Sequence, residues 1–161
     1  MFREMRRKRQ LLSEAEAIGM LESCTSGVLA VSGDEDYPYA VPLSFAYENG
    51  RLFFHSANAG HKIDAIERNA KASFCVIEAD DVVQSTFTTH FRSAIVFGRA
   101  RILTEDAEKR HALECLARKY SPDYLEEAGP EIEREWKAVC TLELIIEHMT
   151  GKAAREIIRR A

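Results

Sequence analysis

The sequence predicts a mostly β, α+β fold: a small antiparallel barrel of six or seven strands with short helices at its periphery. Three observations predict it. Several segments alternate apolar and polar residues as strands do, an Asn49-Gly50 pair joins two of them, and the helical segments are inserted singly among the strands. The regular strand–helix rhythm of a doubly wound parallel sheet is missing. At 161 residues we expect one domain spanning residues 1–161, with residues 1–12 as a basic N-terminal arm.

The chain begins, after the arm, with a helix and a strand. Ser13 followed by Glu16 is a capping box, in which the hydroxyl and the carboxylate satisfy each other's backbone N–H groups, so a helix is predicted from there to about Ser23. Residues 25–32 predict a first strand, and the turn-rich residues 33–36 end it.

A hairpin is the clearest local prediction. Residues 37–47 alternate, and Asn49-Gly50 is the strongest short hairpin signal, so residues 39–47 are expected to pair antiparallel with residues 51–56. Pro42 lacks a backbone N–H, which predicts a sheet edge, a bulge or a place where another group approaches the backbone. A break at residues 56–60 precedes a short helix that begins near His61.

The C-terminal half predicts further strands around a longer helix. The expected strands are residues 72–79, 86–89, 93–103 and 139–149, with Gly98 marking a bulge. A helix over residues 105–120 has Thr104 as its expected cap, a loop over residues 121–130 follows, and a short helix at residues 131–137 carries the only tryptophan, Trp136.

Composition excludes several classes of function. A formal net charge of −4 argues against a nucleic-acid binder, and we interpret the basic run at residues 6–9 as a solvated arm. No apolar run approaches the roughly 20 residues of a membrane span, and no apolar N-terminal segment indicates secretion. Four scattered cysteines are typical of reduced thiols in a cytoplasmic protein. Among the histidines and cysteines we find no pair with metal-ligand spacing, which predicts no metal site.

Residues 53–69 contain the best candidate for chemistry. The helix that begins near His61 offers free backbone N–H groups, and Lys62 in its first turn opposes the helix dipole unless an anion binds there. That pattern is typical either of a site that binds the phosphate of a nucleotide-type cofactor or of an ordinary solvated helix. Ser44, His55, Ser56 and Arg92-Ser93 add polar groups at strand ends in apolar surroundings. Such donors suit a flat heteroaromatic ring, although each is also compatible with a structural role.

Four segments together resemble a known family. They are AVPLSFAY at residues 40–47, LFFHSANAGHKIDAIERN at residues 52–69, HFRSAIVFGRARIL at residues 90–103 and MTGKAARE at residues 149–156. In this order they are similar to the FMN-binding split-barrel proteins related to pyridoxamine phosphate oxidase, and within them to the Nim-type, nitroimidazole-resistance group. The resemblance implies a split β-barrel and a homodimer with FMN in a groove at the subunit interface.

The resemblance also implies roles for individual residues. Val41, Pro42, Ser44 and Phe45 would line one side of the isoalloxazine ring, and His55, Ser56 and Ala57 would contact the ring edge and the ribityl-phosphate region. His61 and Lys62 would hold the phosphate, and Arg92 and Ser93 would approach the ring or phosphate from elsewhere in the dimer. Trp136 of the partner chain would form part of the pocket wall.

The implied activity is an FMN-dependent oxidoreductase that passes electrons from a donor such as a reduced nicotinamide to a small electrophile such as a nitroaromatic. His55 would act beside that acceptor as its catalytic residue. The alternative is a flavin- or haem-binding protein without turnover, for storage or sensing. Residues 151–161 lack the basic substrate motif of pyridoxamine phosphate oxidases, so oxidation of pyridoxamine phosphate is not expected.

Overall fold

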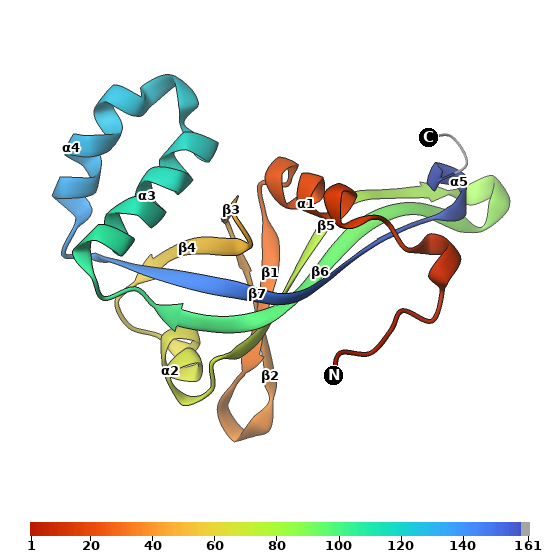
Figure 1. The fold of residues 1–161 in the computed structure, drawn as a ribbon, viewed down its shortest axis with the longest axis horizontal. Helices are drawn as coiled ribbons and strands as arrows, with labels where there is room; N and C mark the ends of the chain where they lie inside the picture. Colours follow the sequence, from red (N-terminus) through yellow and green to blue (C-terminus); the bar gives the residue numbers. More distant parts are fainter. Residues whose placement is uncertain (159–161) are drawn as a thin grey trace.

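The computed structural model describes residues 1–158, in which seven strands form one antiparallel sheet in the order β2-β1-β5-β6-β7-β4-β3 (Figure 1). The last three residues of the tail used in the substrate-motif comparison lie outside the described residues. The strands are β1 (Gly27–Ser32), β2 (Pro38–Leu43), β3 (Ala46–Glu48), β4 (Arg51–Ala57), β5 (Lys71–Val83), β6 (Thr88–Ile102) and β7 (Val139–Ala153). The helices are α1 (Glu14–Ser23), α2 (His61–Arg68), α3 (Asp106–Tyr120), α4 (Leu125–Glu135) and α5 (Arg155–Ile158). The predicted mostly β fold is confirmed.

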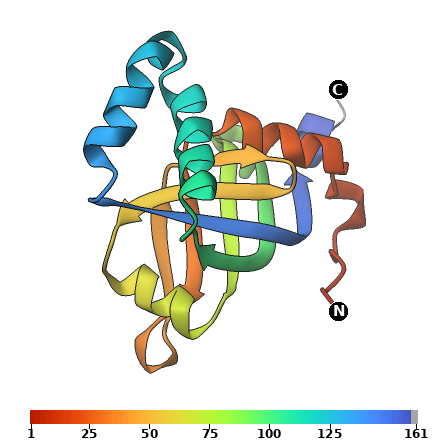
Figure 2. The same cartoon turned by 60° about the vertical axis from the view of Figure 1, so that its left-hand side comes forward.

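The sheet curls into a barrel that remains open along one seam. Its two edge strands, β2 and β3, are consecutive in the chain and separated only by Ser44 and Phe45. The sheet edges must therefore come close together, and the view in Figure 2 shows the strands wrapped around a common interior. Large side chains that include Phe45, Phe54 and Phe74 fill that interior. This is the split barrel that the sequence resemblance implied.

The predicted hairpin is only partly right. Ala46 pairs with Phe53 across the turn at Asn49-Gly50, but residues 38–43 pair with β1 instead, with Val41 opposite Leu29. The single expected strand is divided because the chain passes from one sheet edge to the other at Ser44 and Phe45. The expectation for Pro42 is confirmed, since β2 is an edge strand.

A tyrosine hydroxyl joins the two sides of the seam. Phe45 is fully buried, and its backbone N–H donates a hydrogen bond of 2.8 Å to the Oη of Tyr120, the last residue of α3. The same Oη lies 3.0 Å from the carbonyl oxygen of Phe45 and 2.5 Å from that of Thr25, just before β1. A single hydroxyl thus supplies the seam with the bonds that a neighbouring strand would otherwise make.

The long strands differ from the prediction in the middle of the chain. β6 is continuous where two strands were expected, because β5 extends to Val83 and its end pairs with the start of β6. The bulge predicted at Gly98 is confirmed by a register shift against β7 after Phe97. A side chain at this position would clash with the carbonyl oxygen of Ile145, so the close approach requires glycine.

Two helices begin or extend differently than expected. The Ser13–Glu16 capping box of α1 is confirmed, but α3 begins after Glu105 rather than at a Thr104 cap, and no side chain caps it. α4 spans Gly129 and Pro130, where a loop was predicted. The Pro130 ring removes one backbone donor from α4, and the buried side chain of Ile132 anchors the helix all the same.

The molecule has two distinct ends. Figure 1 shows α3 and α4 beside β4 at one end, and the β5–β6 hairpin, α5 and the N-terminal arm at the other. The arm is attached there, since Leu12 donates its backbone N–H to the Gly151 carbonyl oxygen at 3.0 Å and Gln10 is buried. Among the described residues, no helix has the length and apolar character required to cross a membrane.

We predict that Tyr120→Phe lowers the free energy of unfolding by about 1–3 kcal/mol, the cost of leaving a buried backbone donor without a partner. Urea denaturation measures this change. Tyr37→Phe is the matched control, because the Tyr37 side chain is 73% exposed. Equal stability of the two variants would show that the seam does not depend on the Tyr120 hydroxyl.

Candidate functional site

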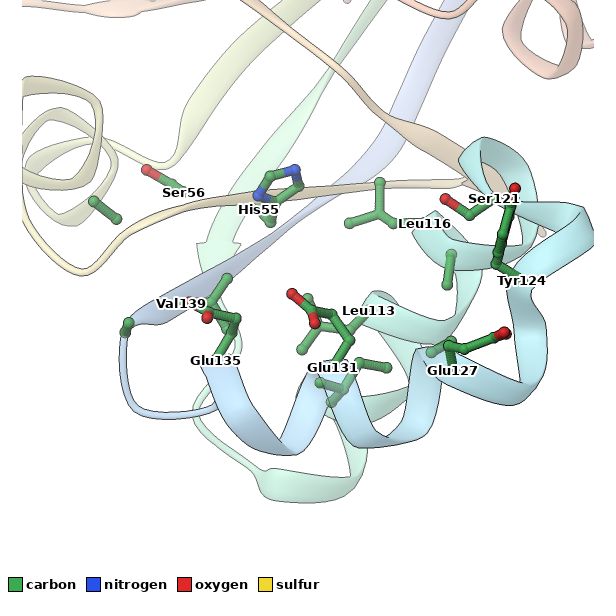
Figure 3. Close-up of a pocket in the computed structure, with 15 residues that line it drawn as sticks. His55, Ser56, Leu113, Leu116, Ser121, Tyr124, Glu127, Glu131, Glu135 and Val139 are labelled. Atoms are coloured by element: carbon green, nitrogen blue, oxygen red, sulfur yellow. The ribbon is translucent and has the colours of Figure 1, made fainter.

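A cavity of about 670 Å³ lies between the outer face of β4 and the helices α3 and α4 (Figure 3). Most of its wall is apolar and comes from Leu113, Leu116, Ala117, Ala128, Ile132, Ala138 and Val139. Polar groups stand at a few positions: His55, Ser56, Ser121, Tyr124, Glu127, Glu131 and Glu135. An apolar cavity with few polar groups is the usual form of a small-molecule site.

His55 is the central polar side chain of the β4 wall. It pairs across the sheet with Thr141 of β7, on the outer face, and Figure 3 shows its ring beside the cavity. Thr141 is fully buried, and its hydroxyl has no hydrogen-bond partner among the described residues. The buried hydroxyl of Ser56 is likewise without a partner within residues 1–158. Thr141 shares the outer face with His55, whereas Ser56 alternates to the core face of β4 and its hydroxyl points away from the His55 ring (Figure 3). Buried hydroxyl groups without a partner are uncommon in folded proteins.

The start of α2 follows directly from this wall. Gly60 precedes the helix with a φ of +135°, a conformation open to glycine, and the backbone N–H groups of His61 and Lys62 have no acceptor in the described part of the chain. Free N–H groups at a helix start attract anions. Burial raises the pKa of the neighbouring Cys140 thiol, and the charges of Lys109 and Lys62 act against that rise, which places Lys62 near the start of β7.

His61 has a second set of contacts. Its ring stacks on Tyr39 with centroids 4.0 Å apart, and its Nε2 accepts a hydrogen bond of 3.3 Å from the Asp34 backbone N–H. Arg68 of the same helix donates to the Asp34 carboxylate at 2.7 Å and holds the pKa of that carboxyl below its ordinary value. The His61 side chain thus fastens α2 to the turn before β2, while the backbone N–H stays free.

The other predicted residues of the first segment lie at the seam. Pro42 and Ser44 are exposed, Val41 packs partly against the core, and Phe45 is fully buried, with its ring 4.7 Å from that of Phe74. The Phe45 side chain has no exposed surface for a ligand. Through Tyr120 the seam adjoins Ser121, which lines the cavity.

Arg92 and Ser93 lie at the opposite end of the molecule from His55. Arg92 pairs with Ala153 and forms an ion pair with Glu78 at 3.0 Å. Leu103, just after β6, lies level with His55, because its N–H donates to the carbonyl oxygen of Thr141 and Thr141 pairs with His55. Arg92 and Leu103 are separated by roughly 35 Å of extended strand. One chain therefore brings His55, Ser56 and Ala57 together with His61 and Lys62, but not with Arg92 and Ser93.

Trp136 lies at the end of α4 and is not part of the cavity wall. Lys109 Nζ and the Arg110 guanidinium lie 4.7 and 5.1 Å from its ring centroid, and Lys109 Nζ also donates to the Trp136 carbonyl oxygen at 2.7 Å. These contacts fix the end of α4 on α3. The expected contact of Trp136 with a partner chain stays a prediction.

Sequence reasoning missed the α4 side of the cavity. Glu127, Glu131 and Glu135 follow one another at intervals of four, which places them on one face of a helix, and Figure 3 shows them along the cavity. That spacing was visible in the sequence, but Gly129-Pro130 led to a predicted loop. A second omission concerns His111 and Cys115, which are four residues apart on α3 and do have the spacing of a ligand pair.

The sequence profile of the family described as pyridoxamine 5'-phosphate oxidase matches residues 13–153 of this chain. The chain belongs to this family. The resemblance found from four short segments is thereby confirmed. The match includes β1 to β7 and every residue that was predicted to contact the cofactor.

Three other proteins illustrate what this chain is similar to. An uncharacterized protein of Rhizobium meliloti (strain 1021) is 28% identical over 153 residues, which are 90% of this chain and 95% of the relative. A candidate 5-nitroimidazole antibiotic resistance protein from Bacteroides thetaiotaomicron is 26% identical with a TM-score of 0.74, covering 88% of this chain and 85% of that one. The FAD and heme binding protein from Mycobacterium smegmatis has the same fold, with 22% identity, a TM-score of 0.75 and coverage of 95% and 80%.

Proposed function

We propose that this member of the pyridoxamine 5'-phosphate oxidase family binds FMN and reduces a small electrophilic acceptor such as a nitroaromatic. The observation that carries the proposal is an open apolar cavity beside His55, next to a helix start with unused N–H groups. The similarity to a candidate nitroimidazole-resistance protein, at 26% identity, supports this class of acceptor.

The residues present fit a flavin mononucleotide. The phosphate would lie at the start of α2, where the backbone N–H groups of His61 and Lys62 and the Lys62 ammonium group are available. The unpartnered hydroxyl of Ser56 would bond the polar part of the cofactor, since a buried hydroxyl gains most from a partner. When bound, FMN would supply the electron transfer, and the protein would orient it and exclude water.

His55 is placed to serve the acceptor. Its ring stands on the β4 wall beside the cavity, where Leu113, Leu116 and Val139 offer apolar contact to an aromatic ring. An imidazole at this position would hold the acceptor by a hydrogen bond or donate a proton as charge accumulates on it. A reduced nicotinamide would be the electron donor.

A flavin- or haem-binding protein without turnover is the second candidate, and the fold shared with an FAD and heme binding protein favours it. The two candidates differ in what lies beside His55. A storage or sensing protein would fill that space with side chains, whereas a cavity of about 670 Å³ remains here. The visible spectrum of the purified protein, followed by anaerobic reduction and reoxidation by a nitroaromatic, separates a turning-over flavoprotein from a haem protein or an inert flavin carrier.

A homodimer would complete the site. Arg92 and Ser93 lie at the far end of the same chain, so only a second copy can bring them to the His55 end. The outer face of the sheet also exposes apolar side chains on neighbouring strands: Val28, Ile77, Ile95 and Phe97. An exposed apolar surface of this kind is typical of an interface between subunits. We also expect the protein in the cytoplasm, in keeping with its four free thiols.

We predict that Ile95→Glu yields monomers with reduced flavin content, because a charge placed on this exposed apolar face opposes its burial between subunits. Sedimentation measures the mass, and the flavin absorbance measures the content. Leu125→Glu on α4, where the side chain is 47% exposed, is the matched control and should stay dimeric. A wild-type protein that sediments as a monomer while holding flavin would contradict the dimer.

We predict that Lys62→Ala weakens FMN binding by about 1.5–3 kcal/mol, the range for hydrogen bonds to charged groups. This corresponds to roughly 10- to 150-fold in the dissociation constant, measured by flavin fluorescence titration. Lys71→Ala removes an exposed lysine at the start of β5 and serves as control. Unchanged affinity in the Lys62 variant would remove this lysine from the phosphate site.

We predict that His55→Ala retains flavin but loses acceptor reduction by about 100-fold or more, the usual contribution of a positioned proton donor. Stopped-flow reoxidation of the reduced protein by a nitroaromatic measures the rate. Because flavin content is recorded on the same sample, a loss of binding is distinguished from a loss of reactivity. Wild-type reoxidation in this variant would show that His55 takes no part.

A further inference from the structure

Three side chains with metal-ligating atoms meet outside the cavity. Glu48 ends the edge strand β3, and His111 and Cys115 stand one helical turn apart on α3. Their ligand atoms all lie within 4.8 Å of one another. Cys115 Sγ is 3.5 Å from His111 Nε2 and 3.5 Å from Glu48 Oε1, and His111 Nε2 is 2.5 Å from Glu48 Oε2.

We propose that Glu48, His111 and Cys115 form a binding site for a zinc ion. Around tetrahedral zinc, with bonds of about 2.3 Å to sulfur and about 2.0–2.1 Å to nitrogen or oxygen, a sulfur and a second ligand atom are ~3.6 Å apart. Both sulfur distances in the cluster match that spacing. Only the distance between Glu48 Oε2 and His111 Nε2 must increase, which a small rotation of the partly exposed carboxylate achieves.

The ligand types favour zinc over other cations. Thiolate and imidazole ligands select zinc among the common divalent ions, whereas magnesium and calcium require oxygen ligands. Within residues 1–158 the cluster offers three protein ligands. The fourth position would face a hollow of about 240 Å³ between β3 and α3, which Glu48 and Cys115 help to line. Water or a small anion would occupy that position, as at zinc sites that keep one open coordination place.

Arg118 competes with the metal in the free protein. Its guanidinium donates to Cys115 Sγ at 3.0 Å and lies 3.5 Å from Glu48 Oε1. The Arg118 side chain is 49% exposed, so it can turn into solvent when the ion enters. The ring of His111 is held by an edge-on contact with Phe53, at 5.7 Å between centroids, and keeps its orientation.

An ion at this position would fasten α3 to the end of β3. That strand is three residues long and forms the open edge of the sheet, and Leu113 and Leu116 of α3 belong to the cavity wall. Zinc binding would thereby fix the helix that carries one side of the flavin-proximal cavity. The proposal does not depend on flavin binding, because none of the three ligands lines that cavity.

Cobalt(II) is the probe, because tetrahedral cobalt with a thiolate ligand gives a charge-transfer band in the near ultraviolet and ligand-field bands at wavelengths beyond flavin absorption. The protein, as purified with any flavin it retains, is treated with a chelator, exchanged into buffer and titrated with Co²⁺. We expect these bands to saturate at one ion per chain and to disappear when Zn²⁺ is added. Absence of the bands at millimolar cobalt would overturn the proposal.

Substitutions of single residues identify the side chains that bind the cobalt ion. Cys115→Ser should abolish the charge-transfer band, and His111→Ala should weaken cobalt binding at least tenfold, while Cys75→Ser leaves both unchanged. Arg118→Ala removes the competing cation from beside the sulfur and should tighten binding by about tenfold or more. A band that survives Cys115→Ser would show that cobalt binds at another cysteine, and binding weakened by Arg118→Ala would show that Arg118 supports the ion rather than competing with it. Either result would overturn the proposal. Circular dichroism confirms that each variant is folded.

Discussion

The seven-stranded sheet curls into a barrel although its two edge strands do not pair with each other. The fold therefore depends on the contacts that hold this seam together. Its edge strands β2 and β3 are joined by two residues, so the seam cannot widen, yet the backbone there has no partner strand. The Tyr120 hydroxyl supplies that partner for Phe45, and Lys119 adds its ammonium group 3.8 Å from the centroid of the Phe45 ring. Partial burial lowers the pKa of the Lys119 ammonium group at this contact. Because both residues end α3, the seam and the helix that walls the cavity are held by one set of contacts.

A buried carboxylate fixes the other end of the same helix. Glu143 of β7 is 1% exposed and accepts hydrogen bonds from Arg51 of β4 at 3.0 Å and from Arg101 of β6 at 2.7 Å. Arg101 extends the network to Glu108 on α3 and holds the pKa of that carboxyl below its ordinary value. The network connects α3 to strands β4, β6 and β7. Replacing one of its arginines would leave the buried Glu143 carboxylate without full compensation of its charge. The cavity thus has a rigid side at β4 and α3.

The sequence was sufficient wherever one local signal determined the structure. The capping box at Ser13, the turn at Asn49-Gly50 and the bulge at Gly98 are each specified by a few neighbouring residues, and all three are confirmed. The break at Ser44 was not predictable, because alternation continues through it and only the barrel's closure divides the strand. The first part of α4 was missed because Gly129-Pro130 is a loop signal that tertiary contacts override, so that a helix was predicted only from residue 131 onward. The Glu48–His111–Cys115 cluster was missed because its third member lies 63 residues from His111 in the sequence.

The positions of the predicted cofactor residues support the homodimer that we propose. His55 and Lys62 belong to one end of the barrel, and Arg92 belongs to the other, at a separation that side chains cannot span. If all three contact one flavin, the flavin must lie between two chains, arranged so that each end meets the opposite end of its partner. A two-fold axis does this for both sites at once. In such a dimer, the unused N–H groups at α2 would receive the cofactor and the exposed apolar side chains on β5 and β6 would be buried against the partner.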